Sequence, residues 1–452
     1  MSAERPVLAR VLANAGTLLG GRTVNAVVSL GYIALTARGL GLAQFGVLAL
    51  ITAFAQFLGD VVKFQSWQTV LQYGAGPLLE NNRPRFQQVV RLSLFLDLTS
   101  GLVGVTLGVA GALLFGSVLG WSRDLAPAAA LYALTIAAMT SATSVGLLRL
   151  FDKFRYLAAE QAISSTVRLI GAGLAFAAHA PLWVFLAAWA AGPVASFLYV
   201  AAVAWREMGR RKLLDGFTLA GPLGEGLPGV WKFAWATNFS SSLDVAFTHV
   251  ITLMVGAILG PAQAALWRIG RQVADGMAKP ARLVIPALYP ELAKLRATGG
   301  DAAMRKLAGQ IGMLGGAVAG VLLLVTAVAG KPLLVLIMGA AYAPAAGIMT
   351  WQVAAAAIGI LALPLEPMLV SMRAAGAALR VRLVVCAVFV AALVPAVKTF
   401  GLYGAGGALV GAALAMAIGM FLTLRVRLAR SSALGNNEAS CADDANDAKG
   451  GR

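Results

Sequence analysis

The sequence is poor in the residues that build metal centres and disulfide frameworks. It contains two cysteines and two histidines in 452 residues. Cys386 lies in an apolar segment and Cys441 in a polar C-terminal tail, so neither a disulfide framework nor metal-ligand spacing is indicated. A phosphate-cradling glycine-rich loop and a large external loop with paired carboxylates are also missing. We therefore expect no metal, no other cofactor and no enzymatic reaction.

Charged residues are scarce as well. They make up 12% of the chain, against 59% hydrophobic residues and a mean hydropathy of +0.80. Water cannot solvate such a chain as one compact domain, and no separate polar domain interrupts the apolar segments. The composition therefore predicts an all-α polytopic membrane protein.

Apolar runs long enough to cross a bilayer follow one another almost to the C-terminus. A hydrocarbon core of roughly 30 Å takes about 20 helical residues. Twelve segments reach that length: 14–37, 44–72, 88–116, 126–148, 157–178, 182–204, 232–258, 263–288, 307–329, 345–370, 380–398 and 403–424. The first is interpreted as an uncleaved helix, because no signal-peptide exit sequence follows it. The small, polar tail after Arg430 is predicted to be disordered.

Basic residues are distributed unequally between the two sides of these segments. With the N-terminus in the cytoplasm, 22 Lys and Arg residues fall in cytoplasmic loops, and Arg38, Arg123, Lys331 and Lys398 in the opposite loops. This positive-inside pattern predicts that both termini are cytoplasmic. Topology and contact with anionic lipid headgroups account for most of the net charge of +17, so nucleic-acid binding is not expected.

A short repeat divides the chain into two halves. LGLAQ at 40–44 and LGPAQ at 259–263 match at four of five positions with an offset of 219, which also aligns Lys63 with Arg282. Because each half has six helices, parallel repeats related by a pseudo-two-fold axis along the membrane normal are expected. The predicted organisation is an N-terminal six-helix bundle (1–205), a cytoplasmic connector (206–231), a C-terminal six-helix bundle (232–430) and a disordered cytoplasmic tail (431–452).

One apolar segment carries a stripe of charge. In ALWRIGRQVADGMAKPARLVIPALYP (265–290), charges recur at steps of 3, 4, 4 and 3 residues, which places them on one helix face: Arg268, Arg271, Asp275, Lys279 and Arg282. A charge at the bilayer centre costs several kcal/mol, so this face is expected to line a polar lumen. Its sum of +3 predicts an anionic partner.

Other segments offer comparable polar faces. They comprise Arg22, Asn25, Ser29, Tyr32 and Thr36 in the first segment, Gln56, Asp60, Lys63 and Trp67 in the second, Arg168 in the fifth, and Asn238, Ser241, Asp244, His249 and Thr252 in the seventh. Arg168 is about 11 residues inside its segment and hence near mid-membrane. A basic cavity between two bundles is the simplest architecture that uses all of them.

Two stretches of the chain resemble a known family. ALTARGLGLAQFGVLALITAFAQFLGDV (34–61) and PLLVLIMGAAYAPAAGIM (332–349) are similar to polysaccharide-exporter flippases of the Wzx type, within the multidrug, oligosaccharidyl-lipid and polysaccharide exporter superfamily. The resemblance implies a V-shaped fold of twelve helices in two bundles. It also implies translocation of undecaprenyl-pyrophosphate-linked oligosaccharide across the bacterial inner membrane by alternating access, with membrane lipids and polysaccharide polymerase and export proteins as partners.

The chemistry of the candidate residues fits such a substrate. Arginine engages a pyrophosphate with two parallel hydrogen bonds and lysine engages it as a point charge. The predicted basic substrate-binding residues are Arg168, Arg268, Arg271, Lys63, Lys279, Arg282 and Arg22. The sugar is expected to meet the polar side chains of Asn25, Ser29, Tyr32, Asn238 and Ser241 and to stack on Trp67 and Trp267.

Acidic residues inside membrane segments are candidates for coupling to a proton or sodium gradient. They are Asp60, Asp97, Asp244, Asp275 and Glu366. Glu366 lies between Pro364 and Pro367, whose missing backbone donors should bend the tenth segment and could free carbonyls for an ion.

Structural interpretations of the same residues remain open. Asp60 with Lys63, and Asp275 with Lys279 or Arg271, have the spacing of helical ion pairs. Arg22 and Arg282 lie close enough to helix ends to reach the headgroups. His249 also fits a packed, hydrogen-bonding residue.

Two other functions also remain open. A multidrug cation antiporter of the same superfamily would favour a lumen dominated by carboxylates. A membrane glycosyltransferase, O-antigen polymerase or ligase would recognise the same lipid but usually carries a large external loop with catalytic groups.

Overall fold

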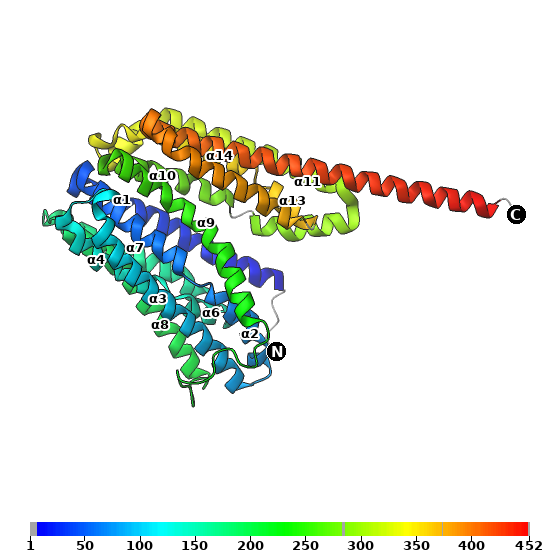
Figure 1. The fold of residues 1–452 in the computed structure, drawn as a ribbon, viewed down its shortest axis with the longest axis horizontal. Coiled ribbons are helices and arrows are strands. Elements are labelled where there is room, and N and C mark those ends of the chain that lie inside the picture. Colours follow the sequence, from blue (N-terminus) through cyan, green and yellow to red (C-terminus); the bar gives the residue numbers. More distant parts are fainter. Residues whose placement is uncertain (1–6, 283–284, 373, 451–452) are drawn as a thin grey trace. The chain divides into compact units, whose positions relative to one another are not determined.

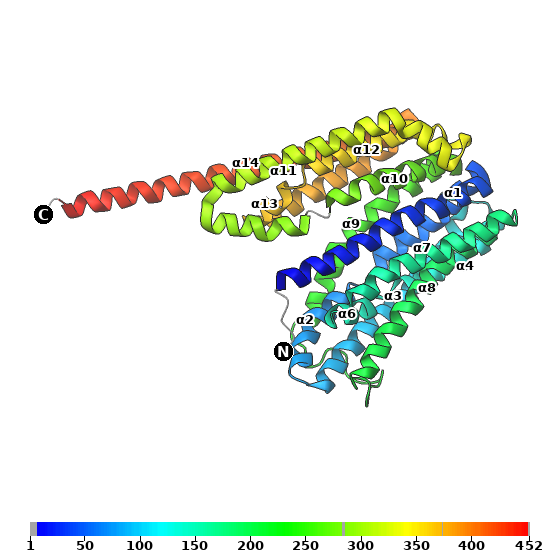
Figure 2. The same cartoon turned by 180° about the vertical axis from the view of Figure 1, so that it is seen from behind.

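A computed structural model describes the backbone of residues 7–282, 285–372 and 374–450, and the side chains within them apart from 7–24, 26–27, 239–248, 277–282, 285–308, 311, 371, 375 and 428–450. Within these ranges the chain forms helices and loops and no strand. The first half contains α1 (Val7–Val62), α2 (Ser66–Leu79), α3 (Arg83–Leu119), the short 3-10 helix η1 (Arg123–Leu125), α4 (Ala126–Ala133), α5 (Thr135–Met139), α6 (Ala142–Leu150), α7 (Phe154–Ala177) and α8 (Leu182–Arg210). The second half contains α9 (Val230–Leu259), α10 (Pro261–Arg282), α11 (Ile285–Met338), η2 (Ala340–Tyr342), α12 (Ala345–Leu361), α13 (Leu365–Ser371) and α14 (Ala375–Gly450) (Figures 1 and 2).

The helices have the length and apolar surface that a membrane requires. Seven helical stretches in the described part of the chain are long and apolar enough to cross one. Two of them, Val28–Leu79 and Gly376–Arg427, have 52 residues each, more than twice the length of one crossing. The apolar side chains of Leu98, Leu102 and Leu114 on α3 are 64–72% exposed, as expected for a lipid-facing helix surface. The prediction of an all-α polytopic membrane protein is confirmed.

Glycine kinks separate successive membrane segments. α1 passes through Gly41 at φ 69° and ψ 178°, and α14 passes through Gly401 at φ 60° and ψ −139°. α9 ends at Gly260, with φ 88° and ψ 171°, directly before α10. Only glycine adopts such angles without strain. Gly41 and Gly260 are equivalent positions of the two repeat copies and share nearly the same backbone conformation.

Two predicted segments are interrupted within the membrane. The second segment breaks at residues 63–65, between α1 and α2, where the Phe64 N–H donates to Ser100 Oγ at 3.3 Å. The fourth segment is divided into α4, α5 and α6, with a break at 140–141. The Thr140 hydroxyl bonds back to the Ala137 carbonyl at 2.8 Å, a local bond that competes with the helical ladder. Hydropathy alone predicts both segments as continuous.

The described contacts divide the chain into two compact units, Met1–Ala265 with Ile337–Ala341, and Leu266–Leu336 with Tyr342–Arg452. The first unit therefore includes α9, which the sequence places at the start of the C-terminal bundle. α9 packs beside α1, and a Cβ at Gly256 would lie 2.2 Å from Leu50 Cδ2. Glycine thus permits a close approach of the two helices. The bundle limits at 206–231 stay a prediction.

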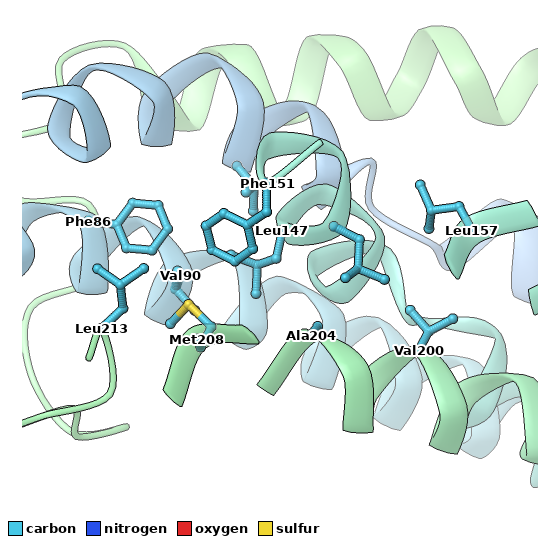
Figure 3. Packing of buried hydrophobic residues seen from close by; sticks show 11 residues of the cluster. Phe86, Val90, Leu147, Phe151, Leu157, Val200, Ala204, Met208 and Leu213 are labelled. Carbon is cyan, nitrogen blue, oxygen red and sulfur yellow. The ribbon is translucent and has the colours of Figure 1, made fainter. Parts of the chain in front are cut away.

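Each unit has its own apolar core. In the first unit, a cluster joins α2, α3, α6, α7, α8 and the start of the connector; Figure 3 shows its members Phe86, Val90, Leu147, Phe151, Leu157, Val200, Ala204, Met208 and Leu213 along these elements. In the second unit, Met368 and Leu369 of α13 pack with Met420 and Leu424 of α14. The first core includes α7 and α8, which carry Arg168 and Trp189, and the second includes α13, which carries Glu366.

The connector is tied to the start of α3. Gln87 Nε2 donates to the carbonyls of Leu213 and Asp215 at 2.8 and 2.9 Å, and Arg91 Nε donates to the Thr218 carbonyl at 2.7 Å. Arg83 pairs with the Asp215 carboxylate at 3.3 Å. Side chains at the start of α3 therefore donate hydrogen bonds to backbone carbonyls of the connector.

α14 continues as helix to Gly450, beyond the last predicted membrane segment (Figure 1). The small and polar composition of the tail predicts disorder, and the structure differs from that expectation. Propagating a helix adds one hydrogen bond for each residue fixed, so a long preceding helix favours its own extension.

Candidate functional site

Arg168 lies within a cluster of aromatic and hydroxyl groups in the first unit. Its Nε on α7 donates to the Trp189 carbonyl of α8 at 3.1 Å, and its Nη1 donates to the Tyr32 hydroxyl of α1 at 3.4 Å. The guanidinium carbon is 5.7 Å from the Tyr32 ring centroid and 5.4 Å from that of Trp189. Gly192 leaves room for it, because a Cβ there would lie 2.7 Å from Arg168 Nε. Both rings stabilise the cation through their quadrupoles.

The polar face of α1 packs against the helices that hold Arg168. Ser29 Oγ lies 3.4 Å from Ser165 Oγ, and the Ser165 hydroxyl also donates to Asn25 Oδ1. Trp189 Nε1 donates to Thr36 Oγ1 at 3.0 Å. The structure thus brings the predicted residues of the first segment together, but turns them toward α7 and α8: Ser29 and Tyr32 are both 7% exposed.

The charge of Arg168 has no counterion among the described side chains, since none of their carboxylates forms an ion pair with it. The described contacts use two of the five guanidinium N–H donors. A partly buried cation without a carboxylate is costly in a predicted membrane segment and is a functional candidate for that reason. An anionic group would use the remaining donors.

A second cluster surrounds the break between α1 and α2. The Arg149 guanidinium stacks at 4.1 Å over the Trp67 ring, and Trp67 Nε1 donates to Gln65 Oε1 at 2.7 Å. Glu160 of α7 accepts from the Ser196 hydroxyl at 3.2 Å and lies within electrostatic range of Lys63 and Arg149. Arg149 therefore covers a ring that the sequence predicts to stack on sugar.

Asp60 pairs with His249 and not with Lys63. Asp60 Oδ2 of α1 lies 3.2 Å from His249 Nε2 of α9, and both side chains are partly exposed. The predicted structural pair of Asp60 with Lys63 does not form, because Lys63 lies where the helix has already broken. His249 has a polar partner, as expected for a hydrogen-bonding histidine.

In the second unit, the charge stripe of α10 is partly neutralised within the helix. Arg271 Nε lies 3.0 Å from Asp275 Oδ2, the i,i+4 pair expected from the spacing. Arg268 is partly buried. Trp267 is 1% exposed, and its carbonyl accepts from Gln352 Nε2 at 3.1 Å. The ring of Trp267 is a core side chain, so the structure offers no open face for the stacking predicted there.

The remaining candidates are scattered. Asn238 is buried on α9, and Asp97 is buried on α3. Glu366 is partly buried at the start of α13, after the break at 362–364 that the flanking prolines predict. Five predicted residues lie outside the described side chains: Arg22, Ser241, Asp244, Lys279 and Arg282.

Three contributors were missed from the sequence. Ser165 precedes Arg168 by three residues on the same helix, a spacing that could have identified it. Arg149 was assigned to the cytoplasmic basic residues, and Trp189 carries no charge or motif that marks it. Their roles depend on contacts between residues far apart in the sequence, such as Ser165 with Ser29 and Arg149 with Trp67.

Comparison with solved structures identifies the fold as that of two-lobed membrane transporters. The chain is similar to a multidrug resistance MATE family transporter of the MOP superfamily in an inward-facing conformation, with a TM-score of 0.66 and 14% identity over 93% of this chain and 99% of that one. It is also similar to the lipid II flippase MurJ in an inward closed conformation, with a TM-score of 0.62 and 13% identity over 90% of this chain and 87% of that one. At such identities the likeness concerns the fold alone.

Sequence comparison defines the family. Residues 11–296 match the model of the family described as polysaccharide biosynthesis protein. The chain is also 32% identical over 345 residues to the inner membrane protein YghQ of Escherichia coli (strain K12), covering 74% of this chain and 93% of that protein. The chain belongs to the polysaccharide biosynthesis protein family, and its expected resemblance to exporters of this superfamily is confirmed.

Proposed function

We propose that this protein is a flippase that moves undecaprenyl-pyrophosphate-linked oligosaccharide units from the cytoplasmic to the periplasmic leaflet of a bacterial inner membrane, for exopolysaccharide, capsule or O-antigen synthesis. Membership of the polysaccharide biosynthesis family supports this class of substrate. The fold is shared with MurJ, a lipid II flippase. In this proposal both termini are cytoplasmic. Polysaccharide polymerase and export proteins are the candidate partners.

Arg168 is the observation that carries the proposal. Its guanidinium lies on α7, a predicted membrane segment, on two aromatic rings and beside neutral acceptors, with no ion pair to a described carboxylate. A pyrophosphate would supply the missing negative charge and accept two parallel hydrogen bonds. Further basic residues are proposed to contact the same substrate during translocation: Lys63, Arg149, Arg268 and Arg271.

The sign of this charge separates the proposal from multidrug transport. A cationic drug would be repelled by an unneutralised guanidinium in a medium of low dielectric constant. The similarity to multidrug transporters rests on the fold, which hosts different substrates. Cation transport therefore serves as the second arm of the test.

Reconstituted liposomes test the proposal. A fluorescent undecaprenyl-pyrophosphate oligosaccharide is followed by quenching with a membrane-impermeant reductant, and accumulation of a cationic dye is measured in parallel. We expect the wild-type protein to flip the lipid. Arg168→Ala should slow flipping roughly ten- to hundredfold, because a hydrogen bond to a charged group contributes about 1.5–3 kcal/mol.

Two variants guard against a folding artefact. Arg168→Lys keeps the charge and loses the planar fork, so it should retain intermediate activity. Arg123→Ala removes an exposed arginine on η1 and should flip lipid at the wild-type rate. Wild-type flipping by a folded Arg168→Ala protein would refute the role of this arginine, and dye transport without lipid flipping would replace the proposed function.

A further inference from the structure

A pocket opens between the first turns of α3 and the end of the connector, within the first unit. Its volume is about 600 Å³. The residues that line it include Asn82, Arg85, Gln88 and Arg91 from α3, and Pro222 and Gly226 from the connector. The membrane segment predicted for α3 begins at residue 88, so the pocket lies at the predicted edge of the membrane.

Two arginines of α3 hold the connector against the helix and so shape the pocket. Arg85 Nη2 donates to the Gly226 carbonyl at 3.4 Å. Arg91 Nε donates to the Thr218 carbonyl at 2.7 Å, and its Nη2 donates to the Thr218 hydroxyl at 3.3 Å. A Cβ at Gly221 would lie 2.5 Å from Arg91 Nη1, so the connector passes directly beside this guanidinium. The walls of the pocket are therefore joined by specific contacts.

Neither of these arginines has a carboxylate partner among the described side chains. Arg83, two residues before Arg85, pairs with Asp215, but Arg85 and Arg91 form no such ion pair. The described hydrogen bonds use one of the five N–H donors of Arg85 and two of those of Arg91. Both guanidinium groups therefore keep charge and donors for a ligand.

The charge of the pocket favours a ligand with two negative charges. Its lining contains two arginines and no acidic side chain, which gives a sum of +2. The two residues are six positions apart, or about 9 Å along α3, and their charges repel each other. An anion between them removes this repulsion. The start of α3 adds partial positive charge on the same side.

A phosphomonoester meets these requirements. It carries roughly −1.5 to −2 charges at pH 7 and three acceptor oxygens. A guanidinium group can donate two parallel hydrogen bonds to it, so one phosphate can engage both arginines. A carboxylate ligand would balance only one of the two charges.

An acidic residue of the connector sets a limit on the affinity. Glu225 is exposed, and its carbonyl accepts from the Gln88 side chain. Its carboxylate forms no ion pair with a described basic residue and does not line the pocket. It lies close enough to oppose an anion, so we expect Glu225→Gln to tighten binding.

We propose that Arg85 and Arg91 bind a phosphomonoester group in the pocket between α3 and the connector. An anionic lipid headgroup and a soluble phosphorylated compound both offer this group at the predicted membrane edge. Because the two arginines contact the connector as well, the bound phosphate would fasten the connector to α3. The site does not depend on the lipid-linked substrate proposed above.

Thermal unfolding of the purified full-length protein in a neutral detergent tests the site. The midpoint is measured at constant ionic strength with dioctanoyl phosphatidic acid, with glycerol 3-phosphate and with dioctanoyl phosphatidylcholine. Because a ligand that binds only the folded state stabilises it, phosphatidic acid should raise the midpoint in a saturable manner, and phosphatidylcholine should not. A shift with glycerol 3-phosphate as well would assign the site to soluble compounds, and a shift with phosphatidic acid alone would assign it to a lipid.

Variants of the same helix end locate the binding. Arg85→Gln should raise the half-saturating concentration of phosphatidic acid about tenfold, and adding Arg91→Gln should abolish the shift. Arg85→Lys keeps the charge without the planar fork and should give an intermediate value. Arg83→Gln is the matched control, because Asp215 already neutralises Arg83, and should change the concentration less than about twofold.

Three results would overturn the site. They are the absence of a saturable shift with phosphatidic acid in the wild-type protein, an unchanged shift in the double variant of Arg85 and Arg91, and equal weakening by Arg83→Gln and Arg85→Gln. The last result would mean diffuse attraction to a positive surface. Lipid flipping is measured separately, so each of these results leaves the proposed flippase function intact.

Discussion

Arg168 and Arg271 are predicted for the same role, and the structure places them in different surroundings. Arg168 is held by neutral acceptors and two aromatic rings, without an ion pair to a described carboxylate. Arg271 is held by Asp275, one turn along its own helix. Under the proposed function, the first charge binds an anionic substrate without competition from a described carboxylate, whereas the second has a competitor in Asp275. Charge pattern alone does not tell an available arginine from a neutralised one.

The two tryptophans that the sequence predicts to stack on sugar extend the comparison and give the largest expected effect. Trp267 is 1% exposed, so Trp267→Ala should lower the free energy of unfolding by about 3–5 kcal/mol through cavity formation. Trp67 is partly exposed, so Trp67→Ala should cost less. A titration with sodium dodecyl sulfate measures the free energy of unfolding of both variants.

A conservative variant separates packing from substrate contact at Trp267. Trp267→Phe fills most of the site and should keep lipid flipping near the wild-type rate. Loss of flipping by Trp267→Phe with unchanged stability would mean that the ring contacts substrate in another conformation, and would restore the predicted stacking role.

The repeated turns give a smaller effect and test whether the two halves are equivalent. Gly41 and Gly260 have φ of 69° and 88° with ψ near 180°, a region that is essentially restricted to glycine. Gly41→Ala and Gly260→Ala should each destabilise the protein by about 1–3 kcal/mol. The titration with sodium dodecyl sulfate measures the loss of stability in each variant.

A glycine in ordinary helix provides the control. A methyl group added at Gly276 of α10 would meet open space, so Gly276→Ala should leave stability unchanged or raise it by up to about 1 kcal/mol. A neutral Gly260→Ala beside a destabilising Gly41→Ala would show that the two turns, although similar in sequence, contribute differently to stability.

The fold was largely predictable because membrane segments leave a strong signal in hydropathy and charge. The all-α membrane fold, the paired turns at Gly41 and Gly260 and the bend before Glu366 all follow from local sequence, whereas the count of twelve segments stays a prediction beside the seven apolar stretches of the described residues. The breaks at 63–65 and 140–141 were missed, because a hydropathy average is insensitive to a few residues. They are stabilised by tertiary bonds such as Phe64 N–H to Ser100 Oγ.

The candidate site was less predictable, because its groups meet across the sequence. The i,i+4 spacing of Arg271 and Asp275 was sufficient to foresee their ion pair. The surroundings of Arg168 come from α1 and α8, with partners 136 and 21 residues away. A helical face also does not reveal whether it meets a lumen or another helix, which is why the polar face of α1 was expected to be open and is packed.

The ion pair of α10 gives the smallest effect and the finest test of the comparison. A partly exposed i,i+4 pair contributes about 0.3–0.5 kcal/mol. If Arg271 also binds the lipid pyrophosphate, Asp275→Asn removes its competitor and should lower the half-saturating lipid concentration about twofold, the fold-change that corresponds to this energy. Arg271→Gln should raise that concentration.

The double variant determines whether the two effects share one origin. Because Asp275 is expected to act on the substrate through Arg271, adding Asp275→Asn to Arg271→Gln should bring no further gain in affinity. The same twofold gain in both backgrounds would mean that Asp275 repels the anionic lipid directly. Arg271 would then be a structural residue, and the contrast with Arg168 would be complete.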